Sequence, residues 1–419
     1  MSHPPLTGRI LPGTLVNGQP ATLGVMGGGQ LGRMFVHAAQ RMGYFTAVLD
    51  PDAASPAGLV SHHHIQTAYL DEQGLAQLMQ RCAAITTEFE NVPAPALLTL
   101  GAHRPVAPGA DAVAIAQDRA QEKAHFTRCG VPVAPNAVIE TAAQLAAVPD
   151  ALLPGILKTA RMGYDGKGQM RVKTRAELAA AWDELKHVPC VLEKMLPLAA
   201  ECSVIVARGW DGQIVNFPVQ RNLHREGILA VTEVFEGHVP PALATQAIAA
   251  TKSIAEGLRY VGVLCVEFFI LQDGSLVVNE MAPRPHNSGH YSVDACDHSQ
   301  FDLQVRTLAG LPLVQPRLHS PSIMLNLLGD IWLERGRTPI QDNGFSGASS
   351  ATTKLDSDPE QGPPWDQVLA LPGTHLHLYG KLKASKGRKM GHLNITGQTV
   401  DEVRATALAA ARILGIEPF

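Results

Sequence analysis

The strongest constraint on the fold is a regular alternation of short apolar strands and amphipathic helices over residues 21–109. Segments 22–27 and 45–50 are typical of strands, and the residues at 30–43 between them are typical of a helix. A later apolar segment, 83–90, predicts another strand of the same kind. Strands that are joined by helices run parallel in one sheet. The sequence therefore predicts an α/β domain with a doubly wound parallel sheet.

Further units are expected downstream. A helix over about 111–130 leads into a proline-interrupted extended segment, which is typical of a connection between domains. A smaller α/β unit is expected over about 155–208, and a final helix over 401–414. Because 419 residues exceed one ordinary core, we expect two or three domains.

Composition excludes several classes of protein. Hydrophobic residues make up 46% and charged residues 17%, which is ordinary for a well-packed enzyme and excludes a mainly disordered chain. The net charge of -4 argues against a general nucleic-acid binder. No apolar run reaches about 18 residues, so no transmembrane helix is expected. The six cysteines form no C-x-x-C pair and are typical of reduced thiols in a cytosolic protein.

A glycine-rich loop follows the first predicted strand. Gly27, Gly29 and Gly32 have G-x-G-x-x-G spacing, which turns the backbone tightly and presents N–H groups to an anion at a helix N-terminus. Asp50 ends the next strand, where a nicotinamide cofactor would need an acid for its ribose. The same spacing also occurs in plain tight turns of α/β sheets, so both interpretations stay open.

Two acids, Glu88 and Glu90, lie at the carboxyl end of the strand predicted over 83–90. That edge of an open α/β sheet faces the ligand crevice. Two acids at this edge cost the folded state more than they contribute to it, so ligand binding is favoured. Capping of the next helix by Asn91, ahead of Pro93, is the competing explanation.

A basic, glycine-rich loop follows Lys158. Residues 163–169 contain three glycines and Lys167, a combination that suits a polyphosphate because it offers both positive charge and backbone N–H donors. No Gly-Lys-Ser/Thr occurs there, so the loop is not a Walker A loop. A plain β-hairpin turn is the alternative.

Two apolar strands flank an Asp-Gly pair at 273–274, which predicts a two-residue hairpin turn. Such a turn pairs Gln272 with Ser275, and counting outward places Glu267 opposite Glu280. Like charges that face each other across strands are destabilising unless they share a proton or hold a cation. Hard carboxylate ligands suit Mg²⁺ that also binds nucleotide phosphates. A water-screened face is the alternative, and the apolar strands disfavour it.

The next loop, 284–290, contains two histidines. His286 and His290 have the spacing of a zinc-binding helix, but the glutamate of H-E-x-x-H is absent, and Pro285 and Gly289 oppose a helix. A substrate-binding loop is therefore favoured over a zinc site.

A basic run lies near the C-terminus. Its glycines, Gly387 and Gly391, are compatible with a phosphate-binding turn, and a solvated basic face is the alternative. The basic residues are Lys381, Lys383, Lys386, Arg388 and Lys389.

As a set, these segments resemble the 5-(carboxyamino)imidazole ribonucleotide synthetase family of the ATP-grasp superfamily, which acts in de novo purine biosynthesis. The similar segments, in the same order, are GGGQLGRM, TTEFEN, DRAQEK, KTARMGYDGKGQ, VLEKMLPLAAECSV, RNLHREGIL, VEFF…VVNEMAPRPHNSGH and GRKMGHLN. The resemblance runs from about Thr22 to the C-terminus. PRPHNSGH and GRKMGHLN are its most specific parts, because relatives such as biotin carboxylases lack them.

The resemblance implies an α/β ATP-grasp fold in a cytoplasmic homodimer that binds small molecules and neither nucleic acid nor membrane. The expected units are a flexible extension at 1–20, a Rossmann-like domain at 21–117, an ATP-grasp region at 118–320 with a lid subdomain at about 150–208, and a C-terminal α+β domain at 321–419.

Carried over residue by residue, the resemblance implies that Glu267 and Glu280 hold Mg²⁺, or Mn²⁺ in its place, in agreement with the hairpin count. Many ATP-grasp enzymes have a metal-binding Asn where this chain and the named family have Ala282, so the third ligand is unidentified. The implied ATP-binding residues are Arg119, Lys158, Gly163, Tyr164, Asp165, Gly166, Lys167, Gly168, Gln169, Glu193, Lys194, Met195, Glu201, His224, Asn279 and Glu280.

The resemblance also implies a site for 5-aminoimidazole ribonucleotide and a reaction. ATP would phosphorylate bicarbonate to carboxyphosphate, the exocyclic amine of the ribonucleotide would capture the carboxyl group, and the loop at 163–169 would exclude water. The implied catalytic residues are Lys158, Lys167 and Arg284. The implied substrate-binding residues are Gln30, Leu31, Glu88, Tyr164, Asp165, Arg284, His286, Asn287, Ser288, Lys381, Arg388 and Lys389.

Three alternatives stay open. Another ATP-grasp ligase that uses a different carboxylate would share the magnesium hairpin, although the two most specific segments disfavour it. A nicotinamide-dependent oxidoreductase would explain Gly27–Gly32 and Asp50 but would leave Glu267, Glu280 and Lys158 without a role. A catalytically inactive nucleotide-binding module is the third.

Overall fold

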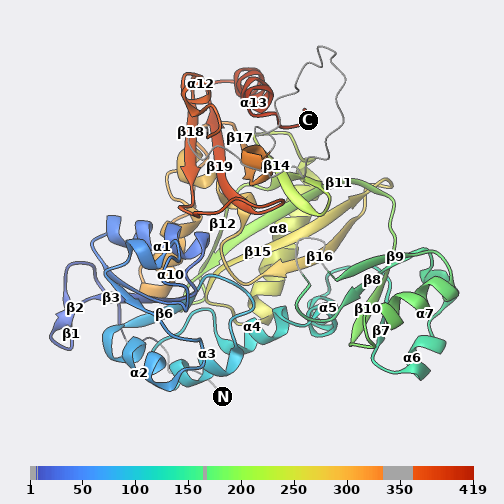
Figure 1. The fold of residues 1–419 in the computed structure, drawn as a ribbon, viewed down its shortest axis with the longest axis horizontal. Coiled ribbons are helices and arrows are strands. Elements are labelled where there is room, and N and C mark those ends of the chain that lie inside the picture. The colour runs from blue at the N-terminus through green and yellow to red at the C-terminus, as the bar shows by residue number, and fades with distance from the viewer. Residues whose placement is uncertain (1–5, 7, 164–167, 334–361) are drawn as a thin grey trace, which may run out of the picture.

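The computed structural model describes residue 6 and residues 8–163, 168–333 and 362–419. Its N-terminal part, blue in Figure 1, contains a four-stranded parallel sheet in the order β5-β4-β3-β6. The strands are β3 (Thr22–Met26), β4 (Phe45–Leu49), β5 (His63–Ile65) and β6 (Ala84–Thr87). This confirms the predicted parallel sheet. The switch point of the strand order lies between β3 and β6, where ligands of such sheets bind.

Helices cover both faces of this sheet because its strands are apolar on both sides. On one face, Leu23 and Val25 pack with Phe35 of α1 (Gln30–Arg41) and with α10 (Gln300–Ala309). The other face packs against α2 (Glu72–Arg81) and α3 (Ala94–Gly101). Each such buried side chain contributes about 1.5–3 kcal/mol to folding. The 3₁₀ turn η1 (Gly58–Val60) connects β4 to β5.

A nine-stranded sheet forms the centre and continues into the C-terminal part of the chain (Figure 1). Its order is β16-β15-β11-β13-β14-β17-β19-β18, with β12 paired to β11. The strands are β11 (Leu198–Arg208), β12 (Ile214–Asn216), β13 (Gln220–Arg225), β14 (Ile228–Val234), β15 (Gly262–Leu271), β16 (Leu276–Ala282), β17 (Ser322–Leu328), β18 (Thr374–Leu378) and β19 (Lys389–Thr396). The associated helices are α8 (Pro241–Gly257), η3 (Asn287–Gly289), α9 (Ser292–Ala295), α11 (Asp330–Leu333), α12 (Trp365–Leu369) and α13 (Val400–Leu414).

A separate four-stranded sheet, in the order β7-β10-β8-β9, lies beside the central sheet and is green in Figure 1. Its elements are β7 (Asn136–Ile139), α6 (Ala142–Ala146), η2 (Asp150–Leu152), β8 (Gly155–Thr159), β9 (Gln169–Val172), α7 (Arg175–Glu184) and β10 (Cys190–Lys194). The lid bounds expected at about 150–208 differ at both ends, since β7 pairs with β10 and β11 pairs with β15 of the central sheet. Strand partners are set by long-range hydrogen bonds, which a local pattern does not contain.

The helix expected over about 111–130 is in fact two helices, α4 (Ala110–Ala116) and α5 (Arg119–Arg128). The break occurs at Asp118, whose backbone is extended and whose carboxylate accepts hydrogen bonds from the N–H groups of Ala120 and Gln121. Asp118 therefore caps a new helix.

In the extension that the sequence predicts to be flexible at 1–20, the described residues 8–20 include a buried side chain and a short hairpin. Ile10 is buried, and its N–H donates to Ala309 O at the end of α10. The strands β1 (Leu15–Val16) and β2 (Gln19–Pro20) form a short antiparallel hairpin. The local Pro and Gly content does not reveal this packing, because it depends on a helix almost 300 residues downstream.

All six cysteines are free thiols. In the part of the chain that the structure describes, no helix is long and apolar enough to cross a membrane.

Candidate active site

A cavity of about 860 Å³ lies where the N-terminal sheet, the small sheet and the central sheet meet. Its lining includes Glu88 beside the N-terminal sheet, Lys158 of the small sheet, and Glu267 of the central sheet. Lys389, from the C-terminal part of the chain, also lines it. A volume of this size is ample for a ligand as large as a nucleotide. The site is therefore built by segments that are far apart in the sequence.

The carboxylate hairpin has the predicted pairing but not the predicted turn. Glu267 faces Glu280 across β15 and β16, which confirms the sequence count. The turn has three residues instead of two, because Leu271 N donates to Ser275 O and Gly274 takes a positive φ of 81°. A β-bulge at Asn279 shifts the register back by one residue, since Phe268 pairs with Val278. The two departures cancel.

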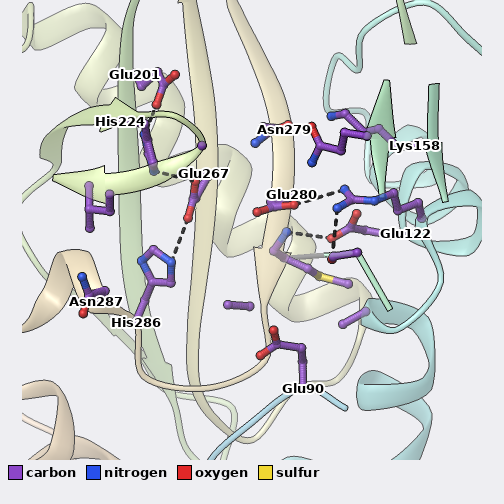
Figure 2. Close-up of a pocket in the computed structure, with 18 of the residues that line it drawn as sticks. Glu90, Glu122, Lys158, Glu201, His224, Glu267, Asn279, Glu280, His286 and Asn287 are labelled. Atoms are coloured by element: carbon purple, nitrogen blue, oxygen red, sulfur yellow. Dashed lines mark hydrogen bonds and ion pairs between the residues drawn. The ribbon is translucent and has the colours of Figure 1, made fainter. Parts of the chain in front are cut away.

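Glu267 lies between two histidines (Figure 2). His286 Nε2 is 2.8 Å from Glu267 Oε1, and His224 Nε2 is 3.9 Å from Glu267 Oε2. His224 also contacts Glu201 through Nδ1. Burial opposes ionisation of Glu267, but His286 lowers its pKa to about 2. Burial likewise disfavours the charged form of His224, but the contact with Glu201 raises its pKa. Acids and imidazoles thus alternate along this wall.

Glu280 faces the opposite wall, which α5 provides. Arg119 Nη1 lies 3.1 Å from Glu280 Oε2. One turn further along α5, the buried Glu122 accepts a hydrogen bond of 2.7 Å from Met281 N. Burial, followed by the neighbouring charge of Glu280, raises the pKa of Glu122 to about 8. Glu122 was not among the predicted site residues, although the helical spacing of Arg119, Glu122 and Lys123 in DRAQEK indicates a shared face.

A buried group of charges forms the wall beside the small sheet. Glu193 of β10 binds Lys158 of β8 through Oε2 at 3.0 Å and Lys123 of α5 through Oε1 at 3.1 Å. Burial opposes the charge on Glu193, but the two lysines lower its pKa. Burial lowers the pKa of Lys158. The group holds two ammonium ions and one carboxylate.

The glycine loop already binds carboxylates with its N–H groups. Gly28 N donates to Asp50 Oδ2 at 2.7 Å, Gly29 N donates to Glu88 Oε1 at 2.9 Å, and Gly32 N donates to Glu88 Oε2 at 3.2 Å. Tyr69 also donates to Asp50 at 2.7 Å. Burial raises the pKa of Glu88. The N–H groups and the acid that a dinucleotide would need are therefore engaged within the chain, which disfavours the oxidoreductase alternative.

Arg284 forms an ion pair with Glu90, which joins the central sheet to the N-terminal sheet. Burial opposes ionisation of Glu90, but Arg284 lowers its pKa to about 2. Arg284 also donates to Pro285 O at 3.1 Å. The sequence placed Glu90 at the ligand edge of the sheet, but it did not predict the ion pair of Glu90 with Arg284.

Most predicted site residues meet in this cavity. Those that line it are Gln30, Leu31, Glu88, Arg119, Lys158, Gly163, Gln169, Glu193, Lys194, Met195, Glu201, His224, Glu267, Asn279, Glu280, Arg284, His286, Asn287 and Lys389. Tyr164, Asp165, Gly166 and Lys167 lie outside the described residues.

Four predicted residues with described positions do not line the cavity: Gly168, Ser288, Lys381 and Arg388. Ser288 is buried behind His286, whose Nδ1 lies 2.9 Å from Ser288 Oγ. Lys381 Nζ contacts Gln30 Oε1 at 2.5 Å, and so reaches a lining residue. Arg388 donates to Lys383 O at 2.6 Å instead.

Comparison with known families gives three adjoining matches. The ribonucleotide synthetase preATP-grasp domain matches residues 20–117, and the ATP-grasp domain matches residues 124–301. The phosphoribosylaminoimidazole carboxylase C-terminal domain matches residues 322–406.

Individual relatives agree with these matches. The N5-carboxyaminoimidazole ribonucleotide synthase of Bacillus subtilis is 38% identical over 383 residues, which cover 91% of this chain and 93% of the relative. The crystal structure of an ADP complex of N5-carboxyaminoimidazole ribonucleotide synthetase superposes with a TM-score of 0.84 at 36% identity, covering 98% of this chain and 99% of the other. The Aspergillus clavatus N5-carboxyaminoimidazole synthase, in complex with ADP and 5-aminoimidazole ribonucleotide, gives a TM-score of 0.81 at 29% identity, covering 94% and 99%.

Proposed function

The chain belongs to the N5-carboxyaminoimidazole ribonucleotide synthase family of ATP-grasp ligases, and we propose that its cavity carboxylates 5-aminoimidazole ribonucleotide with ATP and bicarbonate. The products are 5-(carboxyamino)imidazole ribonucleotide, ADP and phosphate. The observation that carries the proposal is the single cavity in which the facing pair Glu267–Glu280 lies together with Lys158 and the loop around His286.

Nucleotide binding is assigned to the small sheet and α5. Lys158 and Arg119 line the cavity, so they would neutralise the phosphates, while Glu193, Glu201 and His224 would bind near the adenine and ribose. Phosphoryl transfer needs positioning and charge neutralisation more than covalent chemistry from the protein. Lys158, held by the buried Glu193, and Arg119, held by Glu280, would supply both.

Glu267 and Glu280 would hold Mg²⁺. Among the described residues, no cluster of three or more His, Cys, Asp or Glu side chains is arranged to hold a metal ion. Two carboxylates nevertheless fit Mg²⁺, which usually keeps several waters and takes further ligands from substrate phosphates. When bound, the cation would neutralise charge on the transferring phosphoryl group.

The substrate side is assigned to Arg284, His286, Asn287 and Lys389, which line the cavity beside Glu267. Bicarbonate is a weak electrophile, so its oxygen would attack the γ-phosphorus, the bond to ADP would break, and carboxyphosphate would form. The amine nitrogen of the ribonucleotide would then bond to the carboxyl carbon as phosphate leaves, and the nitrogen would release one proton. Cationic side chains that line the cavity would favour each charged intermediate.

We also propose a cytoplasmic homodimer and the division of the chain near residues 21, 118 and 321. Free thiols support a reducing compartment. Buried clusters centred on the N-terminal sheet, on β11, β15 and α8, and on β17, β19 and α13 support the division, and α10 packs from the central part onto the N-terminal sheet.

The test is ADP release with ATP, Mg²⁺ and bicarbonate, with and without the ribonucleotide. We expect strong stimulation by the ribonucleotide, loss of activity in Glu280→Gln, and normal activity in Glu256→Gln, an exposed control on α8. ADP release that the ribonucleotide does not affect would leave an ATP-dependent ligase with a different substrate. A folded protein that releases no ADP would refute the proposal.

A further inference from the structure

Lys123 is a buried lysine that the proposed reaction does not use. Its side chain is 3% exposed, and its ammonium lies 3.1 Å from Glu193 Oε1. The contact is an ion pair without an aligned hydrogen bond. Burying an ammonium ion costs several kcal/mol unless a partner offsets it. A lysine buried at this cost is therefore expected to have a functional role.

Lys123 does not line the cavity, whereas Glu193 and Lys158 do. Glu193 separates the two ammonium ions, with Oε1 toward Lys123 and Oε2 toward Lys158. Lys123 can therefore affect a ligand only by positioning Glu193 or by the electrostatic effect of its own positive charge.

The charges of this group do not cancel. Two ammonium ions and one carboxylate leave one excess positive charge, and Lys158 is the cation of the group that faces the cavity. Without Lys123, Lys158 and Glu193 would form a neutral pair, and Glu193 would be free to bind Lys158 with both oxygens. The electrostatic attraction between this group and a polyphosphate would weaken for two reasons: the net positive charge would be lost, and Glu193 would engage Lys158 more fully.

Lys123 also lies at a position that connects two parts of the cavity wall. It lies on the face of α5 that carries Arg119, bound to Glu280, and Glu122, bound to Met281 N. Through Lys123 the same helix also reaches β10 of the small sheet. Thus α5 connects the sheet that carries Lys158 to the strand that carries the proposed metal ligand.

We propose that Lys123 is a positioning residue that holds Glu193 and supplies the excess charge by which Lys158 binds the nucleotide phosphates. This inference rests on the proposed function for the identity of the nucleotide. It is tested by binding alone, without bicarbonate or ribonucleotide, so failure of the carboxylation reaction and failure of this inference are distinguishable.

The experiment measures dissociation constants of ATP, ADP, AMP and adenosine for the full-length protein. Lys123→Met and Lys123→Gln remove the charge, and Lys123→Arg keeps it. Lys173→Met removes an exposed lysine next to β9 and is the matched control. Thermal unfolding without nucleotide checks that each variant folds.

We expect Lys123→Met and Lys123→Gln to bind ATP more weakly by on the order of tenfold, with a smaller loss for AMP and little change for adenosine. Lys123→Arg restores most of the ATP affinity, and Lys173→Met binds like the parent protein. Equal weakening of all four ligands would show a merely structural role and overturn the proposal. Unchanged ATP affinity in a folded Lys123→Met would also overturn it, as would failure of both uncharged variants to fold.

Discussion

Replacing Glu122 with Gln should stabilise the nucleotide-free protein, and more so as the pH rises. Glu122 is buried and accepts a hydrogen bond from Met281 N. Burial raises its pKa from 4.5 to about 8. The folded state therefore binds this proton more tightly than the unfolded state does. Its contribution to stability is full below pH 4.5 and is lost as the pH rises to about 8.

The size of the effect follows from the pKa difference. A shift from 4.5 to about 8 corresponds to about 5 kcal/mol at 1.36 kcal/mol per unit. Glutamine mimics the protonated acid and keeps an oxygen for Met281 N, so it avoids this loss. The difference in unfolding free energy between Glu122→Gln and the parent should be small at pH 5 and reach several kcal/mol at pH 9.

Urea unfolding at pH 5, 7 and 9 measures this difference, with Glu256→Gln as an exposed control that should show no such trend. A difference that does not change with pH would refute the reasoning. A Glu122→Gln variant that is less stable than the parent at pH 9 would also refute it.

Three further predictions concern the walls of the cavity. Gly29→Ala should lower the unfolding free energy by about 1–3 kcal/mol in urea titrations, because an added Cβ would lie 2.5 Å from Glu88 Oε1; unchanged stability would contradict the loop geometry. Arg284→Met should cost about 1–3 kcal/mol at pH 7 by leaving the partly buried Glu90 unpaired. Since the pKa of Glu90 is about 2 in the parent, that cost should shrink as the pH falls from 4.5 toward 2, and a constant cost would argue against it. Glu267→Gln should raise the Mg²⁺ concentration needed for half-maximal ADP release by at least about tenfold, and an unchanged Mg²⁺ requirement would exclude Glu267 as a ligand.

Local patterns were sufficient for the N-terminal sheet, and they placed Glu267 opposite Glu280 through a turn that the structure does not contain. The hydrophobic periodicity at 21–109 fits only an alternation of strands and helices. In a hairpin, the length of the turn restricts which residues of the two strands can pair. The pairing nevertheless held because a three-residue turn and a bulge at Asn279 cancel, and the sequence predicted neither.

Features that depend on distant contacts were not predictable in the same way. The partner of β11 lies some 60 residues further along the chain, so the small sheet received the wrong bounds. Glu122 and Lys123 resembled ordinary helix-surface charges, because only the folded chain places Met281 and Glu193 beside them. The acceptors for the glycine loop, Asp50 and Glu88, likewise come from two other strands.

The central claim is that ATP activates bicarbonate in this cavity for transfer to the ribonucleotide, and the fate of the bicarbonate oxygens tests it most directly. The protein would be supplied with ATP, Mg²⁺, 5-aminoimidazole ribonucleotide and ¹⁸O-labelled bicarbonate, and the released phosphate analysed by mass spectrometry before the label exchanges with water. We expect phosphate that carries an oxygen from bicarbonate, formed in step with ADP and dependent on the ribonucleotide. Phosphate whose new oxygen comes from water alone would contradict it.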